Sequence, residues 1–428
     1  MIFILYSTVS WTWHIFESAN RFALTRTPRS NNLGENKFPP RMRIALCLEY
    51  PIALRGGVSV LVEALLKEFA GRGHEVVLVS TDTTETVRKT EAGKLIKQHF
   101  HWDFENISVA SSKNLARQLA EARVDVAHFH FGGNYGWGNR LPFRCPVFFL
   151  DRLGVPCVST VHLVVEIFDG YCGPQKPVWF KALMLPLAWC GKMQQLRHVR
   201  REIAVSQHDF QKLRRWYRPL KNRFTQIYHS RLREEKIECR NIKREPVILN
   251  VGHIAWRKGQ FVLVEAFARI APRYPEWTLQ LAGDHGDGDE VEKIRAFVKD
   301  KRLEGRVRLL GERPDAFDLM RQAAIYVQPS FWEALGLALQ EAMFCGCACI
   351  GSQAGGIPEL IRGNETGLLF EPGNVERLSH ALEQLIRDAG QREKFGRAAV
   401  ASIRERGMTI EAMARRHLEL YESIAKTS

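Results

Sequence analysis

Met42-Arg-Ile-Ala-Leu-Cys-Leu48 is an apolar run with the length of a buried strand, and a loop that ends in Gly56-Gly57 follows it. Apolar residues then recur over residues 58–69 at spacings of three and four, which predicts an amphipathic helix. Glu75-Val-Val-Leu-Val79 has the pattern of the next buried strand. Strand, loop, helix and strand in this rhythm predict a βαβ unit of a parallel sheet.

The same alternation continues through the chain, and polarity rises once, over residues 234–245. We therefore predict an α/β protein with two Rossmann-like, doubly wound domains facing a cleft, at 42–243 and 244–410. A last helix, at 411–428, is expected to cross back to the first domain because no strand follows it. Further strands are expected at 124–129, 157–161, 203–205, 246–251, 278–282, 307–310, 325–327 and 348–350, and helices at 259–271, 289–301, 315–323, 336–345 and from 375 onward.

The first 41 residues do not share this pattern. They are apolar and aromatic up to residue 20 and then rich in Arg, Asn and Pro. No basic segment precedes the apolar part, so it is a poor signal peptide. We expect residues 1–41 to be disordered or to lie upstream of the true start at Met42.

The composition indicates the cellular compartment in which the protein works. Its 428 residues include nine cysteines, and none of them are paired at C-x-x-C spacing. Free thiols in this number fit the reducing cytoplasm. No stretch approaches the ~20 apolar residues that a membrane-spanning helix needs. We expect a cytoplasmic protein, and its composition is compatible with a peripheral position at the inner face of the cell membrane.

The net charge of +14 is concentrated in residues 192–244, which hold sixteen Lys and Arg against five Asp and Glu. Such a stretch suits an anionic membrane surface. A solvated helical face is the alternative, and nucleic acid is not expected because no nucleic-acid-binding module accompanies the charge. At its centre Arg214, Arg215, Arg218, Lys221 and Arg223 interleave with Trp216, Tyr217 and Leu220.

Two glycine-containing loops are candidates for binding phosphate. Gly56 and Gly57 come between a strand and a helix, where backbone N–H groups approach a phosphate without a Cβ in the way. Arg257 and Lys258 precede Gly259 in the corresponding loop of the second domain and have the charge to clamp a diphosphate. A tight turn and solvated charge are the respective alternatives.

A pair of glutamates eight residues apart marks a third candidate. Glu333 lies in a loop and is placed to meet hydroxyls of a sugar, and Glu341 lies inside the following helix. Gly336 and Leu337 offer amides at the start of that helix. Glu341 has apolar neighbours, which favours a defined partner such as a ribose diol. The alternative is that Glu333 caps the helix and Glu341 faces solvent.

Three further features are weaker. His162 follows a predicted strand and is placed to hydrogen-bond a substrate oxygen, while a structural role is the alternative, which we favour for His128 and His130. Glu359, in Gly355-Gly-Ile-Pro-Glu359, either helps to shape the donor pocket or interacts favourably with the dipole of a helix that starts there. Asp287 and Asp289 have the spacing of metal-binding aspartates, but they lie in a Gly- and Asp-rich loop, and we expect no metal.

Taken in order, these motifs resemble the retaining glycosyltransferases of family four, also called group one, which have the GT-B fold. The resemblance runs from Met42 to about residue 410 and rests on motifs that recur in the same order. They are Gly56-Gly57, Arg72-Gly-His-Glu-Val76, Asp125-Val-Ala-His128, Ser159-Thr-Val-His162, Lys258-Gly259, Gly283-Asp284, Pro329-Ser330, the Glu333/Glu341 pair, Gly355-Gly356, Pro358-Glu359 and Thr366-Gly367.

The resemblance implies a metal-independent hexosyltransferase that retains the anomeric configuration, needs no cofactor and uses a nucleotide-diphosphate sugar. It implies that His162, Lys258 and Glu333 lie at the reaction centre. Gly56, Gly57, Arg257, Gly336, Leu337 and Glu341 would complete the donor site, with Glu341 on the ribose. The first domain would bind a glycan or lipid-linked acceptor, in cell-envelope or exopolysaccharide synthesis.

Two positions depart from the family pattern. His253 stands where the family usually has Arg, and Arg257 is the candidate replacement. Tyr228-His-Ser230 stands where the family commonly has Asn-Gly. A nucleotide-sugar epimerase of the same architecture and an inactive donor-binding subunit are the competing functions.

Overall fold

The structure is a computed structural model that describes residues 41–53, 56–104, 106–165, 177–234, 243–284, 286 and 288–425. The expectation for residues 1–41 therefore falls, apart from Arg41, outside the described residues, and so does Asp287. The described residues form two parallel sheets, one in each of two lobes. We call residues 41–234 the first lobe and residues 243–405 the second lobe.

The first lobe is built on a sheet whose strand order is β3-β2-β1-β4-β5-β6-β7, with every described pairing parallel. The order reverses between β1 and β4, and at such a switch point the loops after two neighbouring strands diverge and leave a crevice. The strands are β1 (Arg43–Leu48), β2 (Glu75–Ser80), β3 (Gln98–His101), β4 (Val126–Phe131), β5 (Cys157–Val161), β6 (Arg201–Ala204) and β7 (Phe224–Gln226).

The second lobe repeats this plan. Its strand order is β10-β9-β8-β11-β12-β13, again parallel, with the switch point between β8 and β11. Both orders are those of doubly wound Rossmann-like sheets, as the sequence predicts. The strands are β8 (Glu245–Val251), β9 (Thr278–Ala282), β10 (Val307–Gly311), β11 (Ala323–Gln328), β12 (Ala348–Ser352) and β13 (Gly367–Phe370).

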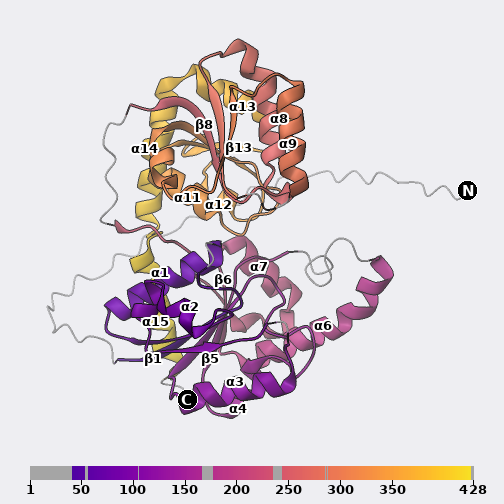
Figure 1. Cartoon of the computed structure of the whole chain (residues 1–428), viewed down its shortest axis with the longest axis vertical. Helices are drawn as coiled ribbons and strands as arrows, with labels where there is room; N and C mark the ends of the chain where they lie inside the picture. Colours follow the sequence, from indigo (N-terminus) through magenta and orange to yellow (C-terminus); the bar gives the residue numbers. More distant parts are fainter. Residues whose placement is uncertain are drawn as a thin grey trace, which may run out of the picture. The chain divides into compact units, whose positions relative to one another are not determined.

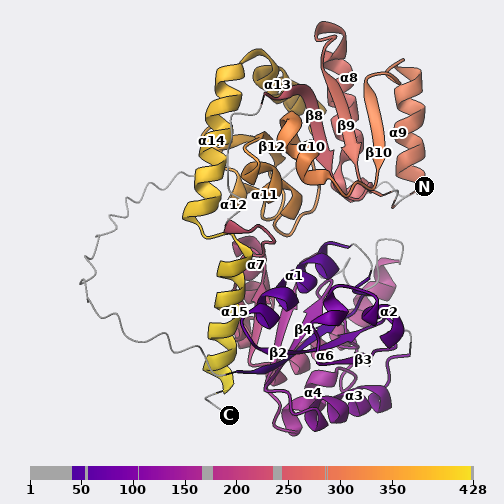
Figure 2. The ribbon, with the colours of Figure 1, turned by 60° about the vertical axis from the view of Figure 1, so that its left-hand side comes forward.

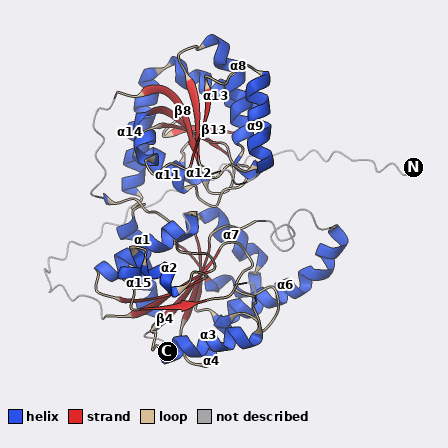
Figure 3. Ribbon diagram, in the orientation of Figure 1, coloured by secondary structure: helices blue, strands red, loops and turns tan. Residues whose placement is uncertain are grey.

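Helices cover both faces of each sheet (Figure 3). In the first lobe these are α1 (Gly57–Gly71), α2 (Thr84–Arg88), η1 (Ala92–Lys94), α3 (Val109–Glu121), α4 (Pro146–Arg152), α6 (Val178–His198), α7 (Gln207–Trp216) and η2 (Arg218–Arg223). In the second lobe they are η4 (Trp256–Lys258), α8 (Gln260–Ile270), η5 (Ala271–Arg273), α9 (Gly288–Asp300), α10 (Ala316–Gln322), α11 (Leu337–Phe344), α12 (Ile357–Leu360), α13 (Val375–Arg387) and α14 (Ala389–Glu405).

Side-chain alternation along the central strands explains the two-faced packing. In β1, Ala45 and Cys47 belong to the core that contains α3 and α4, whereas Ile44 and Leu46 belong to the core that contains α1. Successive strand residues point to opposite faces, so a strand covered on both sides must be apolar throughout. The second sheet is covered in the same way, with α8, α9 and α13 on one face and α11, α12 and α14 on the other (Figure 1).

The last helix, α15 (Ile410–Ala425), packs against the first lobe, beside α1 (Figure 2). Met413, Leu418 and Tyr421 share one core with Leu65 and Phe69 of α1. The chain thus returns to the lobe where it began after completing the second sheet. Because α15 buries apolar side chains on the first sheet, the folding of the two lobes is linked through this helix.

The sequence missed several short elements. The strands β3, β7 and β13 and the helices α2, α4 and α12 have at most seven residues each, too few for a periodic pattern to be read. Helix α3 was also missed: it begins at a capping box formed by Ser108 and Ser111 rather than at an apolar repeat. The predicted helical excursion at Gly170–Trp189 is described only from residue 177, where α6 begins one residue later.

Candidate functional site

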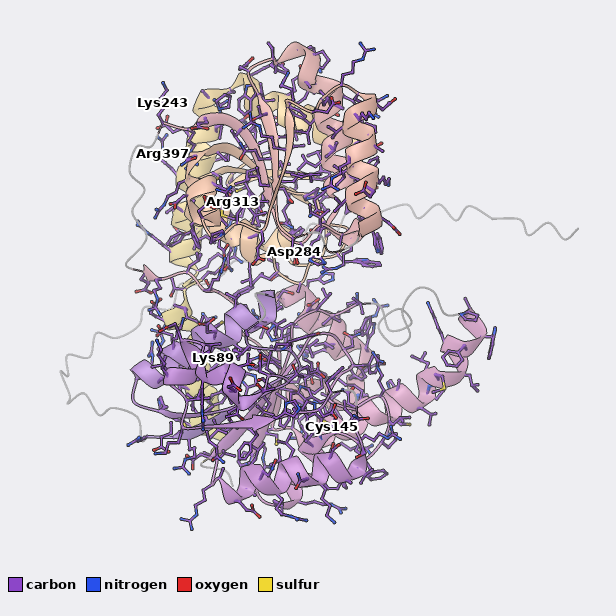
Figure 4. All side chains as sticks on the ribbon, viewed as in Figure 1. Lys89, Cys145, Lys243, Asp284, Arg313 and Arg397 are labelled. Carbon is purple, nitrogen blue, oxygen red and sulfur yellow. The ribbon has the colours of Figure 1, made fainter. Side chains whose placement is uncertain are left out.

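A cavity of about 770 Å³ lies at the carboxyl ends of the strands, lined by loops from both lobes. Its walls include the loops after β1 and β4 and the loops after β8 and β11, which flank the two switch points. Asp284 follows β9 and Arg313 follows β10, and both line the cavity (Figure 4). A cavity of this size accommodates a nucleotide-sized ligand.

The cavity brings together eight of the nine residues that the family resemblance assigns to the reaction centre and the donor site. The ninth, Glu341, is not among the lining residues. Those that line the cavity are Gly56, Gly57, His162, Arg257, Lys258, Glu333, Gly336 and Leu337.

Lys258 and Glu333 form an ion pair in the cavity wall, with 2.7 Å between Nζ and Oε2. Their side chains are 17% and 12% exposed, so the pair is mostly withdrawn from water yet reachable from the cavity. Glu333 Oε2 also accepts hydrogen bonds from Ser330 Oγ at 3.2 Å and Gln328 Nε2 at 3.3 Å. These bonds hold the carboxylate, and through it the ammonium group, in one position.

The backbone explains why a glycine follows Lys258. Gly259 has φ of +71°, and a Cβ there would overlap the carbonyl oxygen of Pro329. The N–H of Phe331 donates to the carbonyl of Arg257 at 2.8 Å. The Lys258 loop therefore lies directly against the loop that carries Glu333, a contact that a side chain at position 259 would prevent.

Glu341 lies one turn into α11, with a side chain only 3% exposed. Both of its oxygens accept from Arg231: Nη2 to Oε2 at 2.9 Å, and Nε to Oε1. Arg231 does line the cavity. Burial lowers the pKa of Arg231, but the hydrogen bonds and charge of Glu341 outweigh it and raise the pKa above its usual value. Glu341, the residue predicted to bind a ribose, is thus bound to the guanidinium of Arg231 in this structure.

Arg231 is a cavity residue that the sequence did not single out. It lies next to Tyr228-His-Ser230, where the chain departs from the family pattern, and inside the basic stretch. That departure was the available signal. The partner of Arg231 is 110 positions away in the chain, and no local pattern connects the two.

His162 lines the cavity and is the first of a series of histidines that runs into the first lobe. Its Nε2 is 3.0 Å from Nδ1 of His130, and its ring centroid is 4.9 Å from that of His229, with the two rings tilted by 53°. His130 in turn lies 4.1 Å, centroid to centroid, from His128, which contacts His417 of α15 at 5.5 Å. His130, for which the sequence favours a structural role, is therefore hydrogen-bonded to a residue that lines the cavity.

Burial keeps these five imidazoles neutral. It lowers the pKa of His162 to about 3 and that of His417 to about 4, and the neighbouring histidines add to the effect on His162. Burial followed by nearby histidines also holds the pKa values of His128, His130 and His229 well below the ordinary range. Because Nε2 of His162 is engaged with His130, Nδ1 is the ring nitrogen left to form a hydrogen bond with a hydroxyl group.

His253 lines the cavity but pairs with Asp284, 2.7 Å from Nδ1 to Oδ1. Arg257, the predicted replacement for the family arginine, also lines the cavity. Within the described part of the chain, its guanidinium forms no ion pair. Arg257 is therefore a cation available to an anionic ligand, whereas Lys258 and Arg231 have carboxylate partners.

Glu359 does not act on its own helix. Its carboxylate accepts from the backbone N–H of Gln207 at 2.8 Å and of His208 at 2.6 Å, the first two residues of α7, and from Tyr228 Oη at 3.0 Å. It therefore satisfies the N-terminus of a helix in the other lobe. Neither of the two interpretations of Glu359 anticipated this contact, and Glu359 does not line the cavity.

The basic stretch places its aromatic side chains inward. Tyr217 is fully buried, and Trp216 and Leu220 pack against the same core. Arg215, Arg218 and Lys221 are exposed. The expected face of interleaved cations and aromatics is thus corrected: Tyr217 is buried and Trp216 and Leu220 are only partly exposed, because these side chains anchor α7 and η2 to the first sheet.

No group of three or more His, Cys, Asp or Glu side chains among the residues that the structure describes is arranged to hold a metal ion. Among the described helices, none combines the length and apolar character that crossing a bilayer requires.

Comparisons with known proteins agree with this architecture. Residues 55–230 match the family described as Glycosyltransferase Family 4, and residues 233–401 match Glycosyl transferases group 1. The N-acetyl-alpha-D-glucosaminyl L-malate synthase of Bacillus anthracis is 24% identical over 360 residues, covering 82% of this chain and 90% of that protein.

Two solved structures illustrate the shared fold. A glycosyltransferase from Rickettsia africae has a TM-score of 0.71 at 20% identity, covering 91% of this chain and 100% of that one. Anabaena HepE in complex with UDP-glucose has a TM-score of 0.66 at 19% identity, covering 90% of this chain and 100% of that one. Both likenesses show the two-lobed GT-B fold.

Proposed function

Because the chain belongs to the group 1 and family 4 glycosyltransferases, we propose that it transfers a hexosyl unit from a nucleotide-diphosphate sugar to a glycan or lipid-linked acceptor, with retention of anomeric configuration. The observation that carries the proposal is the Lys258–Glu333 pair in the wall of a cavity that both lobes line. HepE, which shares the fold, binds UDP-glucose, and this supports a uridine-type donor.

The chemistry follows from the charges at the cavity. Breaking the glycosidic bond to a nucleoside diphosphate builds negative charge on the leaving phosphate. Lys258 and Arg257 supply fixed positive charge, and the amides of Gly336 and Leu337 lie at the start of α11, where helix N–H groups face anions. Cations and amides of this kind stabilise the departing diphosphate without a metal ion.

Glu333 and His162 are assigned to the transferred sugar. Glu333 has one oxygen bonded to Lys258, Ser330 and Gln328, which leaves the other to accept from a sugar hydroxyl. His162, kept neutral by burial, is placed across the cavity in the first lobe. In this assignment no carboxylate acts as a nucleophile.

The test is donor binding followed by transfer. UDP-, GDP-, ADP- and dTDP-sugars are screened by thermal shift, because a ligand that binds only the folded state raises its stability. The preferred donor is then incubated with acceptor, with and without EDTA, and the anomeric configuration of the product is determined by NMR. An inverted product or an EDTA-sensitive reaction would contradict the corresponding part of the proposal.

Two other functions remain distinguishable. An epimerase converts its donor in the absence of acceptor, so an isomerised nucleotide sugar in an acceptor-free reaction would favour it. An inactive donor-binding subunit would show the thermal shift without transfer or hydrolysis. Its motivation is His253, which is engaged with Asp284 in place of the family arginine.

We extend the proposal to an anionic membrane surface, in keeping with envelope or exopolysaccharide synthesis by a cytoplasmic, peripheral enzyme. The exposed cations of residues 192–244 supply the electrostatic part. Sedimentation with vesicles of 30% phosphatidylglycerol at low salt tests it, and a chain that stays in the supernatant would contradict it.

A further inference from the structure

The first half of α6 presents apolar side chains to solvent. Val178 is 76% exposed, Trp179 is 68% exposed and Leu183 is 66% exposed. Leu187 and Trp189 are exposed as well. Monomeric proteins seldom expose large apolar side chains in a contiguous group, and such patches mark interaction surfaces.

These residues form one stripe along the helix. Positions 178, 179, 182, 183, 186, 187 and 190 are exposed and follow the helical repeat, over roughly 20 Å at 1.5 Å per residue. The stripe consists of Val, Trp, Ala, Leu, Pro, Leu and Cys. It therefore contains no charged, amide or hydroxyl side chain.

The second half of α6 anchors the helix. Lys192 and Glu202 of β6 form a fully buried ion pair at 2.7 Å, and Gln195 Nε2 donates to the same carboxylate at 3.0 Å. Met193 and Leu196 belong to the core of the first lobe. The first half extends away from the first sheet (Figure 1), so the stripe is held outward by a rigid support.

The surrounding charge favours an anionic partner. Of the five Lys and Arg between Val178 and Arg201, Lys181 and Lys192 are buried, and Arg197 and Arg201, at the C-terminal end of the helix and just after it, are exposed. The helix also packs against η2, which carries the exposed Arg218 and Lys221. An apolar stripe next to cations is the pattern of helices that lie in the interface of anionic bilayers.

The composition of the stripe distinguishes a bilayer from a protein partner. Trp179 lies in the stripe and the exposed Trp189 lies beside its C-terminal end, and tryptophan is enriched at the level of lipid headgroups. Protein interfaces need polar groups that hydrogen-bond across the contact, and this stripe has none to offer. We propose that the first half of α6 inserts into the headgroup–acyl boundary of an anionic membrane.

This inference deepens the proposed function, because it assigns membrane docking to an insertion element in addition to surface cations. A lipid-linked acceptor lies in the membrane, so docking would bring the cavity to it. If α6 supplies the apolar contact with the membrane, the aromatic residues of the basic stretch need not be exposed for the protein to bind.

The experiment compares vesicle binding by the full chain and two double variants. Trp179→Ser/Leu183→Ser removes the two largest side chains of the stripe. Leu95→Ser/Val109→Ser removes two apolar side chains that are also exposed but lie elsewhere, directly after η1 and at the start of α3. On vesicles of 30% phosphatidylglycerol, we expect the first variant to lose about tenfold in partition coefficient and the second to bind as the parent does.

Each other outcome overturns the inference. Equal binding by the α6 variant and the parent would show that other surfaces dock the protein. Equal binding of the parent to neutral vesicles would remove the role of charge. A dimer that sedimentation velocity detects in the parent but not in the α6 variant would make a second copy of this chain the occupant of the stripe.

A measurement of donor binding distinguishes a failure of the membrane inference from a failure of the proposed transferase function. The α6 variant should retain the thermal shift of the parent with its nucleotide sugar, since α6 does not line the cavity. If the parent shows no shift with any donor, the proposed function fails while the vesicle result stands. If the shift is present and the α6 variant binds vesicles normally, the membrane inference fails alone.

Cys190 allows insertion to be observed directly. It is the exposed thiol among the described cysteines, the others being buried or only partly exposed. In a chain with Cys172→Ser and Cys239→Ser, an environment-sensitive fluorophore on Cys190 should shift to the blue with anionic vesicles. An unchanged spectrum under conditions in which the protein sediments with vesicles would place α6 in water.

Discussion

The two lobes line the same cavity with different chemistry. The second lobe contributes the Lys258–Glu333 ion pair and the hydrogen-bonded side chains of His253 and Asp284. The first lobe contributes the Gly56-Gly57 turn and His162, which burial keeps neutral. The charged wall suits the diphosphate of a donor, and the neutral wall suits hydroxyl groups. The two sheets therefore contribute different chemistry to one cavity, with Arg231 as the exception, because this cation of the first lobe lines the cavity and is paired with Glu341 of the second.

Removing the ammonium group from the charged wall should have the largest effect. Lys258→Ala should lower kcat/KM about 100- to 1,000-fold, the usual loss when one group that stabilises a transition-state charge is deleted. Lys301→Ala is the matched control, because Lys301 pairs with its neighbour Asp300 at the surface. Steady-state kinetics of both variants measure the effect. A Lys258→Ala enzyme with parental activity would remove the charged wall from catalysis.

The Arg231–Glu341 pair tests how the charged wall is supported. Arg231→Met leaves a carboxylate that is 3% exposed without its partner and should cost about 2 kcal/mol of stability, less than for a fully buried pair because Arg231 is 33% exposed. Urea denaturation measures it. Arg231→Met/Glu341→Leu should recover most of the loss, and Arg295→Met, from an exposed pair, should change little. A double variant as unstable as the single one would contradict this account.

Gly355 lies against the backbone of Glu333, so a side chain at position 355 would displace Glu333 in the cavity wall. Its φ is +53°, and a Cβ there would overlap the carbonyl oxygen of Glu333. Gly355→Ala should therefore cost about 2 kcal/mol and lower kcat by displacing Glu333. Gly363→Ala is the control, since the nearest atom to its Cβ is 3.8 Å away. Thermal unfolding and kinetics check both, and equal behaviour of the two variants would disprove the predicted overlap.

The neutral wall predicts acid sensitivity. The buried histidines are neutral in the folded state but bind protons near pH 6.5 when unfolded, so stability is lost as pH falls below 6.5 towards the folded pKa of about 3 for His162. Each contributes up to about 1.4 kcal/mol per pH unit. Burial raises the pKa of Glu49 to about 7 and that of Asp209 to about 8, which has the opposite sign but involves two groups against five.

One histidine substitution measures this effect. His128→Gln should reduce the slope of unfolding free energy between pH 6 and 5 by about 1.4 kcal/mol per unit, the contribution of one proton. His380→Gln, at an exposed position, should leave the slope unchanged. Denaturation at a series of pH values provides the measurement. An unchanged slope in His128→Gln would mean that the histidine series does not govern acid sensitivity.

The site was predictable to the extent that its residues belong to local motifs. Lys258, Glu333 and Gly336 each lie in a strand–loop–helix turn, and parallel sheets bring such turns to one edge. Arg231 and His229 were missed because they lie in the segment after β7, where the chain departs from the family pattern and the pattern therefore assigns them no role. Glu341 was identified from its apolar neighbours, but its partner was not.

The sequence by itself determined the repeated strand–helix order, the glycine loops and the kinds of charge in the cavity. These depend on side-chain periodicity and on backbone freedom at single residues, which are local properties. Only the tertiary structure decided that Arg231 holds Glu341, that Glu359 satisfies the start of α7, and that α6 exposes its apolar stripe. The reason is physical. Ion pairing and burial depend on which distant segments come into contact, and the local sequence around a residue does not show which residue more than a hundred positions away it will contact.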